Sequence, residues 1–193
     1  MEHNLNNLLQ KIAVSLAAYL EKVLPPLFED WWEKAVVNNL SFQQRRHMEQ
    51  RNVGSLAALD LAALLRVLDQ NWYQISSRLH LTSDARHFVK EMQTIRNRWA
   101  HSTTEGFPVE DVYRDLDTLQ RFSAVIGADD ILLQEVRATK TALLAREMRS
   151  SGQGEAIDPL PSQDTKKHGA EFEPGQIVSV KSNRTIRGAV VSV

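Results

Sequence analysis

Large apolar residues recur at steps of three and four between residues 61 and 79, and this run constrains the fold more than any other part of the chain. Steps of this size place side chains on one face of an α-helix, so the run predicts a long amphipathic helix, with Ser55 as its candidate N-cap. The stripe consists of Leu61, Leu64, Leu65, Leu68, Trp72, Ile75 and Leu79.

Weaker stripes of the same period predict the other helices. The first ends before Pro25-Pro26, because proline interrupts a helix. The polar residues 41–54 predict a loop or a solvated face. Predicted helices cover residues 4–24, 27–40, 55–79, 83–101, 108–127 and 129–148. Together they predict an all-α helical bundle over residues 1–149.

The composition changes after Arg149. Residues 150–170 are rich in Ser, Gly, Pro, Asp and Lys and contain almost no large apolar side chain, so they predict a flexible linker. Residues 171–193 hold two β-rich runs on either side of a polar turn, which predicts a hairpin. The pattern from Phe172 resembles the start of a small KOW- or Tudor-like β-barrel. Because the last run ends in mid-strand, we expect the chain to be a fragment of a longer protein.

Composition and charge exclude several kinds of site. The chain has no cysteine, which removes disulfides, thiolate zinc sites and cysteine nucleophiles. The histidine spacing offers no metal-ligand set and no glycine-rich phosphate loop is present, so we expect neither a metal nor another cofactor. A formal net charge of −1 leaves any nucleic-acid contact to local basic clusters. Residues 12–20 are too short an uncharged run to cross a membrane, and we expect a cytoplasmic protein.

The candidate active site lies in the stretch from Glu91 to His101. Helical spacing places Phe88, Met92, Ile95 and Trp99 on a buried stripe, with Ala85 at its edge. Arg96 then lies at the shoulder of the stripe. Asn97 and His101, four positions apart, point away from the core and are available to a ligand or a second subunit. An equally simple interpretation of the spacing is that Arg96 lies along the core edge while His101 complements the helix dipole.

The sequence Arg96-Asn97-Arg98-Trp99-Ala100-His101, together with the upstream segment from Asp60 to Trp72, resembles the Swt-type HEPN domain over residues 5–145. HEPN domains are small helical domains, and many are metal-independent ribonucleases. The resemblance implies that Arg96, Asn97 and His101 are catalytic and that two copies pair as a homodimer with both motifs in one cleft.

The resemblance also implies RNA as the partner. Local basic clusters are the candidate contacts, Arg98 beside Arg96 and the pair Arg45 and Arg46 in the polar stretch, for which a solvated face is the other interpretation. Asp60 has two interpretations: an N-terminal acid that complements the helix dipole, or a supporting residue of the site. In similar bacterial proteins such a domain precedes a barrel and a helicase associated with phage defence, which implies a helicase domain in the same longer chain. The alternative function is a non-catalytic dimerisation or RNA-binding module that regulates a larger effector.

Overall fold

A computed structural model describes residues 2–100 and 107–152 of the protein, and every regular element in these residues is helical. The prediction of an all-α bundle is thereby confirmed for this part of the chain. The last helix continues to Gly152, a few residues past the predicted boundary at Arg149. The rest of the predicted linker 150–170 and the predicted β-barrel start 171–193 lie outside the described residues.

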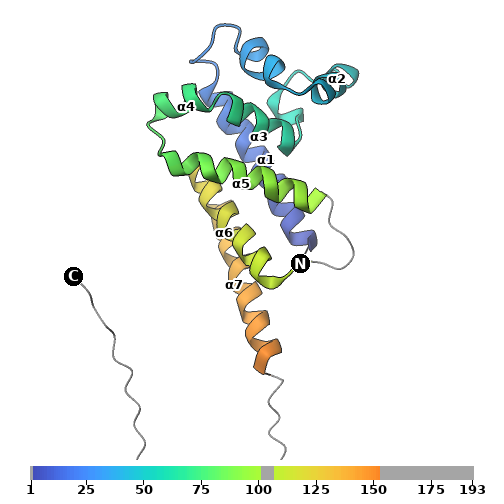
Figure 1. The fold of residues 1–193 in the computed structure, drawn as a ribbon, viewed down its shortest axis with the longest axis vertical. Coiled ribbons are helices and arrows are strands. Elements are labelled where there is room, and N and C mark those ends of the chain that lie inside the picture. The colour runs from blue at the N-terminus through green and yellow to red at the C-terminus, as the bar shows by residue number, and fades with distance from the viewer. Residues whose placement is uncertain (1, 101–106, 153–193) are drawn as a thin grey trace, which may run out of the picture. The chain divides into compact units, whose positions relative to one another are not determined.

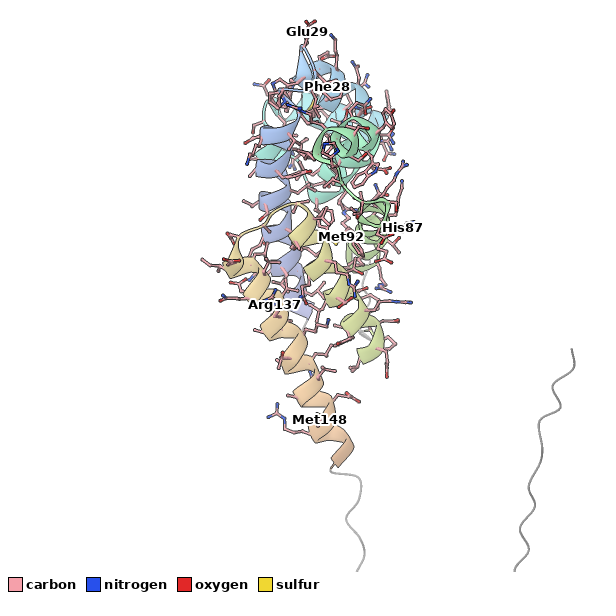
Figure 2. All side chains as sticks on the ribbon, turned by 90° about the vertical axis from the view of Figure 1, so that its left-hand side faces the viewer. Phe28, Glu29, His87, Met92, Arg137 and Met148 are labelled. Atoms are coloured by element: carbon pink, nitrogen blue, oxygen red, sulfur yellow. The ribbon has the colours of Figure 1, made fainter. Side chains whose placement is uncertain are left out.

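Long helices form the frame of the bundle. Helix α5 packs on α3 (Leu61–Gln70) and α6, while α1 packs on α3 and α7. Figure 1 shows α6 and α7 as an antiparallel pair and α5 crossing α1. Met92 of α5 is fully buried among these helices, whereas His87, Arg137 and Met148 lie on the outside (Figure 2). The frame helices are α1 (Glu2–Val23), α5 (Ser83–Ala100), α6 (Val109–Val125) and α7 (Asp130–Gly152).

The connection between α6 and α7 confirms the predicted helix end and start. Gly127 adopts a φ of 64°, a left-handed conformation that suits glycine because it has no Cβ. Two residues later the Oδ1 atom of Asp129 accepts a hydrogen bond from the Leu132 amide at 2.8 Å, which caps the start of α7. The chain therefore reverses in a short turn and brings α7 back along α6.

The single helix predicted over residues 55–79 is wrong in detail. The structure has a 3₁₀ turn η3 (Leu56–Ala58), then α3 (Leu61–Gln70) and α4 (Trp72–Leu79). Ser55 makes no capping hydrogen bond; the Oδ1 atom of Asp60 accepts one from the Ala63 amide at 2.8 Å and caps α3. The break at Asn71 follows from its buried side-chain amide, which donates to backbone carbonyls of Val67 and Ala35. This side chain ties the α3–α4 junction to the preceding segment.

The segment between α1 and α3 also departs from expectation. Instead of one helix over residues 27–40, it forms a π-helical turn η1 (Trp32–Val36) and a 3₁₀ turn η2 (Val37–Asn39). The polar residues that predicted a loop or solvated face contain α2 (Phe42–Gln50). A reciprocal cap explains that helix, since Ser41 and Gln44 each bind the other's backbone amide through their side chains. Only Met48 of α2 is buried, so the helix does present a solvated face.

Candidate functional site

Helix α5 places the motif residues as the sequence predicts within the helix. Its buried face comprises Ala85, Val89, Met92, Ile95 and Trp99, while Phe88 is half-buried. Packing of this face against α3 and α6 fixes the rotation of α5 about its axis. Arg96 therefore lies at the edge of the buried face, and Asn97 is exposed.

Arg96 binds two neighbouring side chains. Its Nη2 atom lies 3.1 Å from Oδ2 of Asp60, and its Nη1 atom donates to Oδ1 of Asn97 at 3.3 Å. The other oxygen of Asp60 caps α3, so Asp60 both closes the start of that helix and contacts Arg96. A supporting role for Asp60 in an active site stays a prediction. The Arg96 side chain is 29% exposed and that of Asp60 is 61% exposed. An ion pair this open to water contributes only about 0–1 kcal/mol, so an anion can reach the guanidinium and replace the carboxylate.

A polar groove of about 430 Å³ is lined mostly by residues of α3 and α5, Arg96 among them, and we call it the α3–α5 groove. The apolar part of its lining consists of Ala62 and Leu65. The polar lining residues are Ser41, Gln44, Arg66, Asp69, Gln70, Lys90, Gln93, Arg96 and Asn97. A pocket dominated by amides and cations suits a polar, anionic ligand better than an apolar one.

The cations of this groove differ in how fully their charge is compensated. Lys90 donates to Oδ2 of the buried Asp69 at 2.5 Å, and Arg86 lies 3.7 Å from the other oxygen of Asp69. Arg66 instead donates through Nε to the backbone oxygen of Asn39 at 2.7 Å. Among the described residues, no carboxylate lies within ion-pair distance of Arg66. Arg66 is thus a cation of the groove whose charge no carboxylate of the described residues compensates.

Arg98, predicted as an RNA contact, is engaged in the fold. Its guanidinium pairs with Asp115 of α6, whose carboxylate also accepts from Nε1 of Trp99 at 2.7 Å. The Phe107 ring packs edge-on against Trp99, with ring centroids 4.7 Å apart, and lies 5.5 Å from the guanidinium carbon of Arg98. These contacts attach the last turn of α5 to α6. A role for Arg98 in binding RNA stays a prediction.

The other predicted site residues are not gathered at the groove. Arg45 is half-buried and Arg46 exposed on α2, and neither lines the α3–α5 groove, which α2 reaches through Gln44. His101 follows the last residue of α5 directly but lies outside the described residues. The structure therefore brings together Arg96, Asn97 and Asp60, and the role of His101 stays a prediction.

The groove residues Arg66, Gln70, Lys90 and Gln93 were not predicted from the sequence. Their spacing could have indicated them. Arg66 and Gln70 lie four positions apart on α3. On α5 the steps are three and four positions, between Lys90, Gln93 and Asn97. Each set shares one helix face. What the sequence does not show is that the two faces meet, because that depends on how α3 packs on α5.

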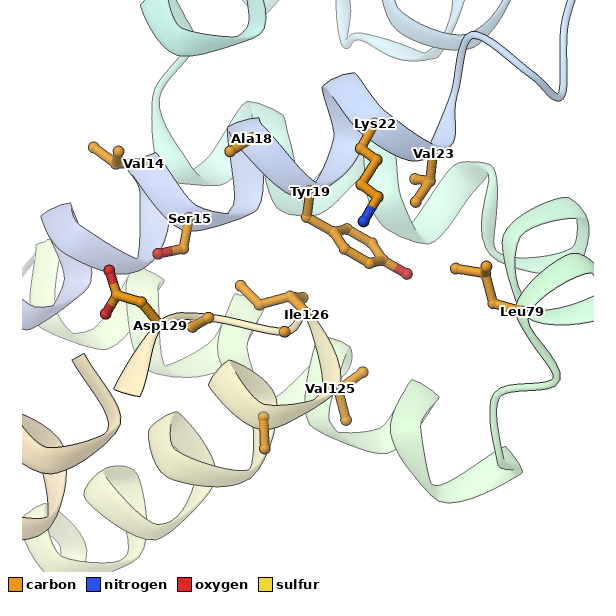
Figure 3. A pocket seen from close by; sticks show the side chains of 13 residues that line it. Val14, Ser15, Ala18, Tyr19, Lys22, Val23, Leu79, Val125, Ile126 and Asp129 are labelled. Atoms are coloured by element: carbon orange, nitrogen blue, oxygen red, sulfur yellow. The ribbon is translucent and has the colours of Figure 1, made fainter. Parts of the chain in front are cut away.

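A second hollow, of about 630 Å³, lies between α1 and the α6–α7 turn and does not include Arg96. Its lining is mostly apolar, and the Tyr19 side chain extends into it from α1, with Leu79, Val125 and Ile126 around it (Figure 3). Burial raises the pKa of the Tyr19 hydroxyl. That hydroxyl oxygen has no hydrogen-bond partner in the described part of the chain. The hollow offers no cation–amide combination like that of the α3–α5 groove.

In the part of the chain that the structure describes, no three histidine, aspartate or glutamate side chains are grouped as metal ligands. No helix in the same residues is long and apolar enough to cross a membrane.

Comparison with known proteins gives one result. A family model described as Swt1-like HEPN matches residues 7–127, from the first turns of α1 to the glycine after α6. Neither the curated proteins nor the solved structures gave a match to this chain. The matched range contains the described part of the α3–α5 groove and the whole Arg96–His101 motif.

Proposed function

Because the chain belongs to the Swt1-like HEPN family, we propose that it is a metal-independent endoribonuclease that acts as a homodimer. The observation that carries this proposal is the position of Arg96. Its guanidinium lines a polar groove and is bound, among the described residues, by the exposed carboxylate of Asp60 and the exposed side chain of Asn97. An arginine in this setting is suited to bind a phosphate through two parallel hydrogen bonds.

The proposed reaction uses the RNA's own 2′-hydroxyl. The 2′-oxygen forms a bond to phosphorus while the bond from phosphorus to the 5′-oxygen breaks. The 2′-hydroxyl loses its proton to a base, and the departing 5′-oxygen gains a proton from an acid. Histidine suits either step because its pKa lies near neutrality, and we assign this role to His101.

Arg96 stabilises the charge that develops on the non-bridging oxygens in the transition state. Asn97, whose Oδ1 already accepts from Arg96, orients the phosphate or the histidine. In HEPN ribonucleases two subunits bring both motifs to one cleft, and this supports a composite site built from two copies. The same resemblance supports a role in phage defence, within a longer chain that includes a helicase.

Cleavage of RNA in the presence of EDTA tests the proposal. We expect wild-type protein, supplied with its natural trigger, to cleave RNA and leave 2′,3′-cyclic phosphate ends. His101→Ala should reduce the rate about 10²–10⁴-fold, because it removes the acid–base group. Arg96→Ala should reduce it about 10²–10³-fold through lost charge stabilisation.

The matched control is Arg78→Ala, which removes an arginine from the last turn of α4, outside the groove. It should cleave at the wild-type rate, and circular dichroism should show that all variants keep their helices. If the wild type leaves RNA intact under these conditions, or if His101→Ala cleaves equally well, the chain is instead a non-catalytic dimerisation or RNA-binding module.

A further inference from the structure

The α3–α5 groove contains polar groups that the fold does not use. Gln70 on α3 and Gln93 on α5 both line the groove, and neither side chain makes a hydrogen bond to any described residue. Arg66, one turn before Gln70, has no carboxylate partner in the same residues. Within the described residues, a cation without a carboxylate partner and two amides without hydrogen bonds therefore line the same groove as Arg96.

From this arrangement, and resting on RNA as the substrate under the proposed function, we propose that the α3–α5 groove binds one adenosine nucleotide next to the phosphate held by Arg96. Arg66 binds the nucleotide's phosphate, and Gln70 and Gln93 bind its base. The groove volume of about 430 Å³ lies in the range of ~300–1,000 Å³ that is usual for small-ligand pockets.

The choice of adenine follows from the chemistry of two side-chain amides, Gln70 on α3 and Gln93 on α5. A glutamine amide offers one donor beside one acceptor, and it binds a base edge that presents an acceptor beside a donor. Adenine presents this pair on two edges, N6 with N1 and N6 with N7, because its amino group carries two hydrogens. Guanine presents two acceptors, O6 and N7, on the edge where adenine presents N6 and N7, while cytosine and uracil lack the N7 acceptor. One adenine can therefore satisfy both glutamines.

The cations in the groove have different roles in this proposal. Lys90 is committed to the buried Asp69, so its removal would disturb the fold, and it does not serve as a test. Arg66 is exposed and makes its described hydrogen bond through Nε alone, which leaves its terminal nitrogens for a phosphate. Replacing Arg66 or Gln93 thus removes a ligand contact without leaving a buried charge unpaired.

Binding of short 2′-O-methyl oligonucleotides, followed by fluorescence anisotropy, tests the groove separately from catalysis, because the methyl group blocks the attacking oxygen. We expect wild-type protein to bind oligoadenylate about tenfold more tightly than oligocytidylate or oligouridylate. Gln93→Leu should reduce this preference to about twofold with little change in salt dependence. Arg66→Met should weaken binding to all three, about fivefold or more, and lower the slope of log Kd against log salt by about 0.7.

Gln74→Leu and Arg78→Met, both on α4 and outside the groove lining, are the matched controls and should bind like wild type. The groove assignment is overturned if Arg66→Met binds as its control does, if Gln93→Leu keeps the adenine preference, or if wild type binds no oligonucleotide. These outcomes are independent of the cleavage assay with His101→Ala. If the protein cleaves RNA but the groove variants bind like their controls, only the groove assignment fails. If the groove variants show the expected effects but the protein does not cleave RNA, only the nuclease proposal fails.

Discussion

At the scale of single residues, Asp115 is a buried carboxylate whose only charged partner in the described chain is Arg98. It also accepts the indole hydrogen of Trp99. Asp115→Ala leaves the half-buried guanidinium without its counter-charge and the indole without its acceptor. We expect it to lower the free energy of unfolding by about 3–5 kcal/mol, measured by urea denaturation.

Glu110→Ala is the control on the same helix, because Glu110 is an exposed acid in the first turn of α6. Its loss should cost about 1 kcal/mol or less. A stability change for Asp115→Ala as small as that of the control would show that the Arg98–Asp115–Trp99 contacts do not hold α5 against α6.

The positions of Arg96 and Asn97 could be predicted because both depend on the period of one helix. The pairing of Arg98 with Asp115 could not, since the two residues are 17 positions apart and meet only through the packing of α5 on α6. Asp60 and Arg96 are separated by 36 positions. For Asp60 the sequence indicated a candidate role but no contact, because nothing local relates the start of α3 to the end of α5.

At the scale of helices, an ion-pair cluster joins α6 to α7. Asp117 accepts hydrogen bonds from Lys140 of α7 and from Arg121 one turn along α6. The hydrogen bond from Lys140 holds the pKa of Asp117 below its ordinary value, and the same bond raises the pKa of Lys140. The Lys140 ammonium also lies 4.6 Å from the Tyr113 ring centroid, a favourable cation–π distance. The cluster therefore links the two helices electrostatically.

This cluster predicts a pH dependence of stability. The pKa of Asp117 is lower in the folded protein than in the unfolded chain. Its contribution to the free energy of unfolding is therefore fully present above the unfolded-state pKa and is lost as the pH falls through the folded-state pKa. Asp117→Asn should lower the free energy of unfolding by about 1 kcal/mol at pH 7, with the difference from wild type shrinking in acid below about pH 4. Urea denaturation across this pH range measures it. Glu21→Gln removes an exposed acid of α1 outside the cluster and is the control, which should lower the free energy of unfolding at pH 7 by less than Asp117→Asn does. A pH-independent difference for Asp117→Asn would contradict the assignment.

The helices with a clear apolar stripe could be predicted from the sequence, and those set by side-chain hydrogen bonds could not. The period of apolar residues in α1, α5 and α6 identifies them directly. Helix α2 has little apolar surface and depends on the reciprocal cap of Ser41 and Gln44. The stripe over residues 61–79 continues through Asn71, so only the buried bonds of that side chain reveal the break between α3 and α4.

At the scale of the whole molecule, the composite-site proposal predicts a two-fold dimer whose interface includes the exposed Asn97 face of α5. In a two-fold interface only residues near the axis lie beside their own copies. The composite site places both copies of Asn97 in one cleft, so a new charge at this position meets a second one. Asn97→Glu should therefore raise the dimer dissociation constant about tenfold or more, measured by sedimentation equilibrium at several salt concentrations. Gln74→Glu adds the same charge on exposed α4 and should leave the constant unchanged. A strictly monomeric wild-type protein at high micromolar concentration would remove the composite site.

Under the proposed function, the ion pair between Arg96 and Asp60 has a consequence for the entropy of phosphate binding. A free arginine side chain samples many rotamers, worth about 2 kcal/mol, and a ligand must restrict them. Asp60 and Asn97 already restrict Arg96 in the unbound protein. A phosphate that replaces the Asp60 oxygen exchanges one anionic acceptor for another, while the other oxygen of Asp60 continues to cap α3. The guanidinium is therefore ordered when the protein folds, and an anionic ligand encounters an arginine whose rotamer is already selected.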